Sequence, residues 1–280
     1  MDRMPLLVLF AIACLLPTTT LRAQDGAAPA TQAPSAALFD TLAARYGVGG
    51  NDQVADTPAY KARIIELARA LPPNDAVRNA RLDAYRCITF LDGPDASLTR
   101  AETGLAGRPA QREPLVRMEY LMCKAYALYN QGHQTEYIVP INEVLRLANG
   151  ERHPRLRSGA LMLRSFHESD QGRYAQALIT LHEALALDPK REAPNAALRT
   201  EIMIANTYIE LGLNERAIVV LRAIEKNARA MGKSAPLDMV LERLGLAEEQ
   251  AGRLDAALAN YRQAAELNRL GGGRTTPMPP

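Results

Sequence analysis

The chain has 280 residues, and its 33 basic and 31 acidic side chains leave a net charge of +2. This balance, without a concentrated basic face, gives no indication of a nucleic-acid partner. Aromatic residues make up 5% of the chain and tryptophan is absent, so we expect cores built from Leu, Ala, Ile and Val.

The N-terminus resembles a secretory signal peptide. The apolar run PLLVLFAIACLL at residues 5–16 follows Arg3, and a small-residue exit permits cleavage after Ala23. This pattern predicts a signal peptide over residues 1–23. The run is shorter than the roughly 20 apolar residues that span a bilayer, although an uncleaved membrane anchor is the alternative reading. We expect an exported mature chain without a stable membrane span, periplasmic in a bacterium with two membranes.

The region after the signal is predicted to pass from disorder into helix. Residues 24–35, QDGAAPATQAPS, have the composition of a disordered leader. Two stretches with apolar residues at helical spacing follow within residues 36–73, and Pro72 and Pro73 end the second. We predict an N-terminal helical segment over residues 36–73.

From residue 74 to 270 the pattern predicts only helix–turn–helix units. Sustained period-two alternation is absent, and so is an Asn-Gly hairpin turn between two such runs, so strands are not expected. The expected helices cover residues 76–91, 95–107, 113–131, 135–149, 156–171, 174–187, 195–211, 214–231, 236–251 and 254–270. The tail, residues 271–280, has a Gly- and Pro-rich sequence that predicts disorder.

A glycine recurs every forty residues in this region, at Gly132, Gly172, Gly212 and Gly252. Each glycine ends one amphipathic stretch and precedes another. A fixed period between 20 and 50 residues is the sequence signature of a stacked repeat array. Glycine at these positions permits the backbone conformation that reverses the chain.

Small residues recur in the same register. They stand seven residues before the glycines at Ala125, Ser165, Ala205 and Gly245, and five residues after them at Ala177, Ala217 and Ala257. Two antiparallel helices approach closely only where small side chains meet at their crossing. We therefore predict that these positions form the crossing within each helical pair.

The stretch QGRYAQALITLHEALALDP at residues 171–189 resembles the second half of a tetratricopeptide repeat. The family pattern is matched by Gly172, Tyr174, Ala177, Leu181, Ala184 and Pro189. The resemblance is good over residues 115–270 and weak over 76–108, where Leu98 replaces the expected alanine. It implies an all-α fold, a right-handed superhelical α-solenoid of helix–turn–helix repeats whose roughly 40-residue period exceeds the family's usual period of about 34.

The resemblance also implies a binding groove lined by the first helix of each repeat. Its positions lie ten, six and three residues before each turn glycine. The candidates for a peptide groove are Met122, Tyr126, Tyr129, Met162, Phe166, Ile202, Asn206 and Ile209. Asn206 occupies the place where relatives often hold a peptide backbone. The alternative is that Met122, Met162 and Phe166 pack against the next repeat.

The basic clamp with which some relatives hold a peptide carboxylate is not expected here. It requires Lys or Arg at the first of the three groove positions. This chain has Met122, Met162, Ile202 and Glu242 there. The pattern favours a groove lined by apolar and aromatic side chains, which adapt to many apolar surfaces.

The elongated repeats also resemble the periplasmic sensor region of membrane-bound diguanylate cyclases. This chain lacks the later membrane helix and the GGDEF motif of those proteins. The resemblance makes a stand-alone or truncated input module of a cyclic-di-GMP system the alternative to a scaffold.

Nothing in the sequence predicts catalysis, a cofactor or a metal site. The histidines, His133, His153, His167 and His182, fall in different repeats without metal-ligand spacing. No nucleophile elbow, phosphate-binding loop or dinucleotide fingerprint is present. We therefore predict a non-enzymatic scaffold that binds a protein or peptide partner, and an envelope enzyme is the least favoured alternative.

Two cysteines remain after the predicted cleavage, Cys87 and Cys123. Export permits a disulfide. The register places them on the first helices of neighbouring repeats, and packed helices lie about 8–10 Å apart, whereas a disulfide requires Cα atoms within about 7 Å. This comparison favours two reduced, buried cysteines.

Overall fold

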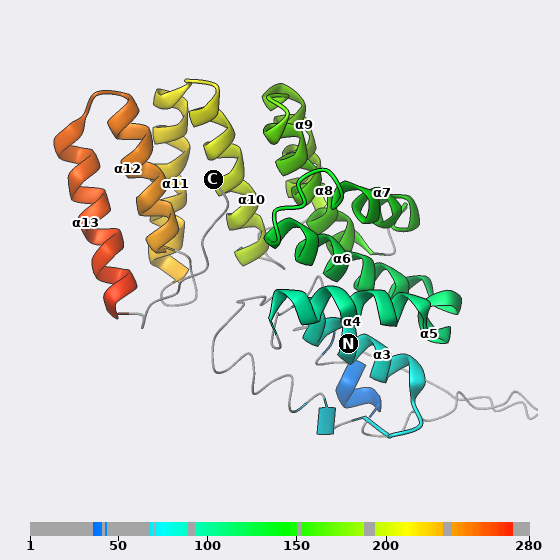
Figure 1. The fold of residues 1–280 in the computed structure, drawn as a ribbon. Helices are drawn as coiled ribbons and strands as arrows, with labels where there is room; N and C mark the ends of the chain where they lie inside the picture. The colour runs from blue at the N-terminus through cyan, green and yellow to red at the C-terminus, as the bar shows by residue number, and fades with distance from the viewer. Residues whose placement is uncertain are drawn as a thin grey trace, which may run out of the picture. The chain divides into compact units, whose positions relative to one another are not determined.

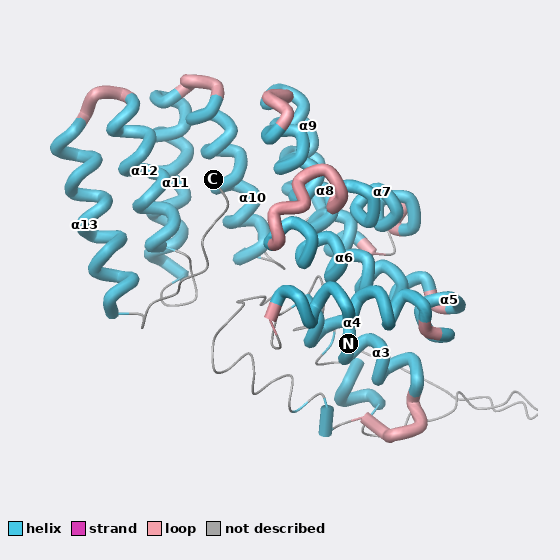
Figure 2. The backbone as a smooth tube through the Cα atoms, in the orientation of Figure 1, coloured by secondary structure: helices cyan, strands magenta, loops and turns pink. Residues whose placement is uncertain are grey.

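The computed structural model describes residues 36–40, 43, 66, 68–69, 71–88, 93–149, 153–187, 194–231 and 237–270. Within these ranges the backbone forms helices and turns, without a strand (Figure 2). All described residues belong to one compact unit, Ala33–Pro280. The predicted signal peptide, leader and C-terminal tail lie outside the described residues, and the predicted domain boundaries stay predictions.

The helices follow the chain in pairs (Figure 1). They are α3 Ala76–Ile88, α4 Pro94–Ala106, α5 Arg108–Arg112, α6 Pro114–Asn130, α7 Ile138–Leu147, α8 Pro154–Asp170, α9 Tyr174–Leu187, α10 Pro194–Glu210, α11 Asn214–Met231, α12 Leu237–Gln250 and α13 Leu254–Leu270. The all-helical prediction is confirmed. The short helix α5 was not predicted, and α7 begins three residues later than predicted because turns bonded to the His133 carbonyl precede it.

The first helices of three successive pairs begin at Pro114, Pro154 and Pro194, forty residues apart. Proline suits the first helical position, because its fixed φ fits the helix and its missing N–H has no partner there anyway. Each of these helices has 17 residues. The backbone therefore repeats with the same step as the turn glycines.

The turn glycines adopt the left-handed conformation that side chains disfavour. The φ angles of Gly132, Gly172, Gly212 and Gly252 are 80°, 70°, 70° and 78°. In each turn the next N–H reaches back to the carbonyl five residues earlier, as Arg253 N does to Glu248 O at 2.8 Å. This bond satisfies a carbonyl that the helix end would leave unpaired.

Consecutive helices pack against each other along the chain from α6 to α13, and α6 also packs against α3 and α4. One core joins α6, α7 and α8 around Met118, Ile141 and Leu163, and another joins α10, α11 and α12 around Ile202, Leu221 and Leu244. Contacts between sequence neighbours are typical of an α-solenoid. The handedness expected for the superhelix stays a prediction.

The small residues at the predicted crossings are buried. Ala125, Ala205, Ala177 and Ala217 have no exposed surface, and Ser165 and Ala257 are 1% and 3% exposed. A Cβ atom on the buried Gly245 would lie 2.7 Å from the Tyr261 ring. The close approach of α12 and α13 therefore depends on a residue without a side chain.

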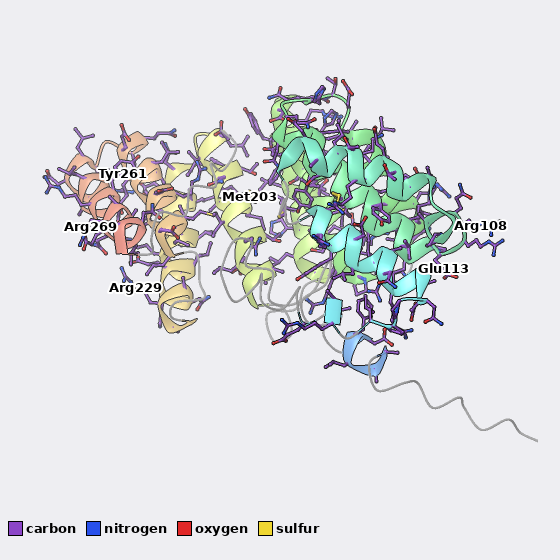
Figure 3. The ribbon with its side chains drawn as sticks, turned by 60° about the horizontal axis from the view of Figure 1, so that its bottom comes forward. Arg108, Glu113, Met203, Arg229, Tyr261 and Arg269 are labelled. Atoms are coloured by element: carbon purple, nitrogen blue, oxygen red, sulfur yellow. A yellow bond between two sulfur atoms is a disulfide. The ribbon has the colours of Figure 1, made fainter. Side chains whose placement is uncertain are left out.

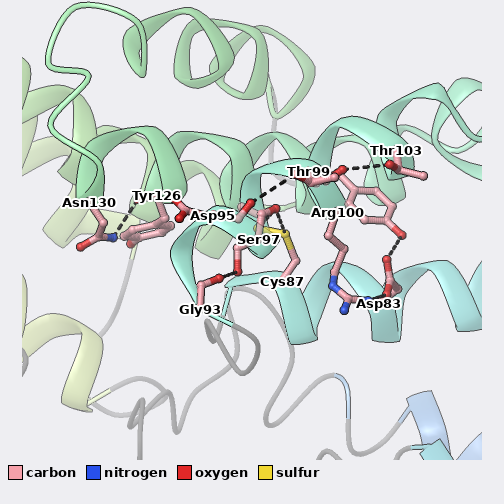
Figure 4. Close-up of a disulfide and its surroundings, with 12 residues drawn as sticks. Asp83, Cys87, Gly93, Asp95, Ser97, Thr99, Arg100, Thr103, Tyr126 and Asn130 are labelled. Atoms are coloured by element: carbon pink, nitrogen blue, oxygen red, sulfur yellow. Dashed lines mark hydrogen bonds and ion pairs between the residues drawn. A yellow bond between two sulfur atoms is a disulfide. The ribbon is translucent and has the colours of Figure 1, made fainter.

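The preference for two reduced cysteines is wrong, because Cys87 and Cys123 form a disulfide between α3 and α6 (Figure 4). Their Cα atoms are 5.8 Å apart. The 8–10 Å typical of packed helices separates their axes and not their Cα atoms. Since Cα atoms lie about 2.3 Å from their own axis, facing Cα atoms approach several ångströms closer than the axes. The small Ala101 beside the sulfur atoms permits this approach.

Candidate peptide-binding pocket between α8, α10 and α12

A pocket of about 270 Å³ lies between the first helices of three repeats. Helices α8, α10 and α12 contribute most of its lining, α6 adds Tyr129, and α9 adds Tyr174 and Leu181. Its apolar lining residues are Tyr129, Phe166, Tyr174, Leu181, Met203, Ile209 and Leu246, and its polar ones are Ser165, Ser169, Asp170, Asn206, Thr207, Glu210 and Arg243. Figure 3 labels Met203 on α10. The pocket thus combines an apolar body with a few polar groups, as ligand sites usually do.

Four of the eight groove candidates line this pocket, namely Tyr129, Phe166, Asn206 and Ile209. Met122 and Ile202 are instead buried in the cores, with 2% and 0% exposure. Met122 packs on the next repeat, since its Cε lies 3.2 Å from the position of a Cβ on Gly159. Tyr126 and Met162 are half-buried outside the lining. A peptide-binding role for any of the eight stays a prediction.

Aromatic rings form one wall of the pocket. The ring centroids of Tyr129 and Phe166 are 5.7 Å apart, and Tyr137 meets Tyr129 edge-on at 5.2 Å. Burial raises the pKa of the Tyr129 phenol. Tyr137 lies in the turn before α7, five residues after Gly132, where the later repeats have alanine, so the small-residue pattern did not predict its role. Its completely buried side chain fixes the Tyr129 ring in place.

Asn206 lies on α10, and its Oδ1 is buried without a hydrogen-bond partner among the described residues. Native proteins pair nearly all such atoms. An unpaired buried acceptor costs about 1–3 kcal/mol. The Asn206 Oδ1 therefore has no donor among the residues that the structure describes, and a ligand could supply one.

Arg243 is the residue that sequence reasoning missed. It lies on α12 beside the predicted groove position Glu242, and its Nε is also buried without a partner among the described residues. Burial lowers the pKa of the guanidinium, although the nearby Glu242 and Glu210 oppose that shift. One residue turns a helical position by about 100°, so a register error of one residue hid this side chain. Met203 holds the equivalent position on α10 and also lines the pocket.

Two carboxylates lie at the turn end of the pocket. Asp170 and Glu210 each precede a turn glycine by two residues. Burial raises the pKa of Asp170, and the Tyr137 hydroxyl donates to its Oδ2 at 3.5 Å. The pocket therefore has acidic groups at this end and one cation on α12.

The described histidines do not converge on this pocket. His133 lies beside Glu136, and His167 Nε2 contacts Gln171 Nε2 at 2.8 Å. The residues that the structure describes contain no cluster of three or more His, Cys, Asp and Glu side chains suited to a metal ion. None of the described helices has the length and apolarity of a membrane span.

Comparison with known proteins identifies the repeat. Residues 240–269, which form α12 and α13, match the family model of the tetratricopeptide repeat. A kinesin light chain of Podospora anserina with nearly identical TPR-like repeats is 16% identical, with a TM-score of 0.54 over 69% of this chain and 96% of that chain. At this identity the likeness shows the fold alone.

A structure of MamA is also similar, with 15% identity and a TM-score of 0.43 over 67% of this chain and 89% of that one. No curated protein matches the chain in sequence. The resemblance to cyclase sensor regions stays a prediction.

Proposed function

We propose that this tetratricopeptide-repeat protein is a non-enzymatic scaffold that holds a segment of a partner protein in the pocket between α8, α10 and α12. One observation carries the proposal: the Asn206 Oδ1, buried without a donor, lies in a pocket lined by groove positions. A peptide backbone offers an N–H to such an acceptor and a carbonyl to the amide nitrogen beside it.

The rest of the lining fits the side chains of an extended segment. Tyr129 and Phe166 offer rigid aromatic surface, which supplies much of the binding energy at protein interfaces. Leu246 and Met203 lie among the polar groups and complete an apolar floor. A volume of about 270 Å³ accommodates one or two side chains rather than a whole domain.

The proposed place of action is the periplasm. The apolar run at residues 5–16 and the cleavage site after Ala23 support export. Mass spectrometry of the chain recovered from a periplasmic fraction tests this part of the proposal. We expect a mature N-terminus at Gln24, and an intact Met1 in the membrane fraction would contradict it.

The binding proposal is tested with a phage-displayed library of random twelve-residue peptides selected on the purified mature protein. We expect a family of related peptides to be enriched, and synthetic copies to bind at least tenfold more weakly to Asn206→Ala. A tenfold loss of affinity corresponds to about 1.4 kcal/mol of binding free energy, which is within the range of hydrogen bonds to buried groups.

The matched control is Asn142→Ala on α7, which removes the same group from an exposed position. It is expected to leave affinity unchanged. Circular dichroism establishes that both variants remain helical. Failure to enrich any peptide, or equal affinities for the wild type and Asn206→Ala, would overturn the proposal.

A further inference from the structure

We propose that the pocket selects a protein segment with a single acidic side chain, whose carboxylate binds Arg243 while its backbone N–H donates to Asn206. This inference rests on the proposed function and names the chemistry of the partner. Its basis is a pair of unmet hydrogen-bonding groups of opposite kind in one pocket, a donor on α12 and an acceptor on α10.

Arg243 differs from Arg78 and Arg81, two other half-buried arginines of the structure. Arg78 binds Asp40 and Asp75 at 2.7 Å, and Arg81 binds Glu119 at 3.0 Å. Each of these guanidinium groups has a carboxylate partner within the protein. No ion pair joins Arg243 to a carboxylate among the described residues, and its Nε is buried there without a hydrogen-bond partner, although a guanidinium offers five N–H donors.

The acidic residues near Arg243 do not replace such a partner. Glu242 accepts a hydrogen bond from Asn268 at 3.3 Å, and Glu210 is exposed to solvent at the turn end of the pocket. Both act on Arg243 only through space. A carboxylate on the ligand would add the charge-assisted, bidentate contact that guanidinium groups prefer.

Asn206 distinguishes a protein segment from a small organic acid. Its unpaired atom is an acceptor, and a carboxylate oxygen has no hydrogen to donate to it. A backbone N–H next to an acidic side chain satisfies both groups at once. The aromatic wall of Tyr129 and Phe166 then receives the apolar neighbours of that residue.

The two carboxylates at the turn end limit the ligand to one acid in the pocket. Asp170 and Glu210 would face any further acidic side chains of the bound segment. Like charges placed opposite each other at an interface disfavour binding. We therefore expect the selected segment to carry one Asp or Glu among apolar residues, with neutral or basic residues toward Asp170.

This contact is not the basic clamp that the sequence excluded. The clamp positions hold Met122, Met162, Ile202 and Glu242, and none of them supplies a cation. Arg243 is offset from the last of them by one residue, on the part of α12 that lines the pocket.

The test uses the mature protein and peptides from the random library described above. Each enriched peptide is synthesised with its acidic residue and with the matching amide, Asp to Asn or Glu to Gln. Isothermal titration calorimetry measures binding of both forms to the wild type, to Arg243→Gln and to the control Arg262→Gln, an exposed arginine on α13. For the wild type and the control, we expect the amide form to bind at least tenfold more weakly.

For Arg243→Gln we expect the two peptide forms to differ by less than about twofold. A second measurement is independent of any peptide: Arg243→Met is expected to leave the urea midpoint unchanged or raise it, because it removes a half-buried cation that has no direct carboxylate partner among the described residues. Arg81→Met is expected to lower the midpoint, because it strands the buried Glu119 carboxylate.

The outcomes separate the two proposals. This inference would be overturned if the enriched peptides lacked acidic residues. It would also be overturned if the amide form lost the same affinity for the wild type as for Arg243→Gln. Either result would leave the scaffold proposal standing. A midpoint that falls as far for Arg243→Met as for Arg81→Met would also overturn it. A library that yields no binder at all would overturn both.

Discussion

Buried carboxylates with matched polar partners connect the two helices of alternate repeats. Glu168 and Glu248 stand four residues before turn glycines eighty residues apart, and both are at most 3% exposed. The Thr180 hydroxyl donates to Glu168 at 2.7 Å, and the Asn260 amide donates to Glu248 at 3.1 Å. Because each buried carboxylate receives a hydrogen bond from the second helix of its pair, these contacts fix the pairing of the helices.

Glu119 is a buried carboxylate of a different kind. Burial raises its pKa to about 7, despite the opposing effect of Arg81 at 3.0 Å. The folded protein therefore binds more protons than the unfolded chain between the ordinary pKa of 4.5 and about 7. By linkage, the stabilising contribution of this group is complete below that window and is lost as pH rises through it.

Replacement of Glu119 by Gln should flatten the dependence of stability on pH. Between pH 4.5 and 8 we expect the free energy of unfolding of the wild type to fall more than that of Glu119→Gln, by up to roughly 3 kcal/mol. Urea denaturation of both proteins across this range measures the difference. Parallel profiles would show that Glu119 titrates near its ordinary value in the folded protein.

Because Gly245 lies in close contact with Tyr261, we expect the effect of Gly245→Ala on stability to change sign when the Tyr261 ring is removed. Gly245→Ala places a Cβ within 2.7 Å of the ring and should destabilise the protein by about 1–3 kcal/mol. In a Tyr261→Ala background the space is free, and the same change should stabilise α12 by up to about 1 kcal/mol, because alanine favours helix. A double-mutant cycle from urea denaturation tests this, and the same sign in both backgrounds would refute the packing argument.

At the scale of the elements, the fixed glycine spacing predicted the long helices well, and it failed where no period applies. Helix α9 has the predicted bounds of 174–187. The five-residue helix α5 follows from the extended Gly107 and from Pro109, and five residues are too few to show a period. Asn206 and Phe166 were predicted for the groove, but Arg243 was not, because a one-residue shift in register moves a side chain to another face of a helix.

The disulfide between α3 and α6 predicts a redox-dependent stability. It closes a loop across a sequence separation of 36 residues. In the chain-entropy account such a cross-link stabilises the folded state by about 4 kcal/mol. We expect a reducing agent to lower the thermal midpoint of the mature wild type. The double variant Cys87→Ala/Cys123→Ala should unfold at the reduced midpoint and not respond to the agent, and a wild-type midpoint independent of reductant would contradict this prediction.

At the scale of the whole molecule, stability is distributed between neighbours rather than concentrated in one core. The cluster of α10, α11 and α12 draws Val240, Leu244 and Ala247 from α12 to cover the apolar side of α10. The cluster of α6, α7 and α8 contains none of these residues. Each repeat therefore depends on the one beside it, as the one-dimensional description of repeat proteins requires.

Removal of the last helical pair should consequently loosen the pair before it and leave the N-terminal repeats intact. A chain that ends after Met231 lacks α12 and α13 and exposes Ile202, Ala205 and Ile209 on α10, which are buried in the full chain. In hydrogen exchange monitored by mass spectrometry, we expect protection to fall at least tenfold in α10 and α11. Protection should change little in α3 and α6, which the disulfide joins. The control truncation after Leu270 keeps both helices and should exchange like the full chain. Nearest-neighbour packing confines the expected effect to the adjacent pair. Uniform loss of protection along the shortened chain would instead show that the repeats unfold as one cooperative unit.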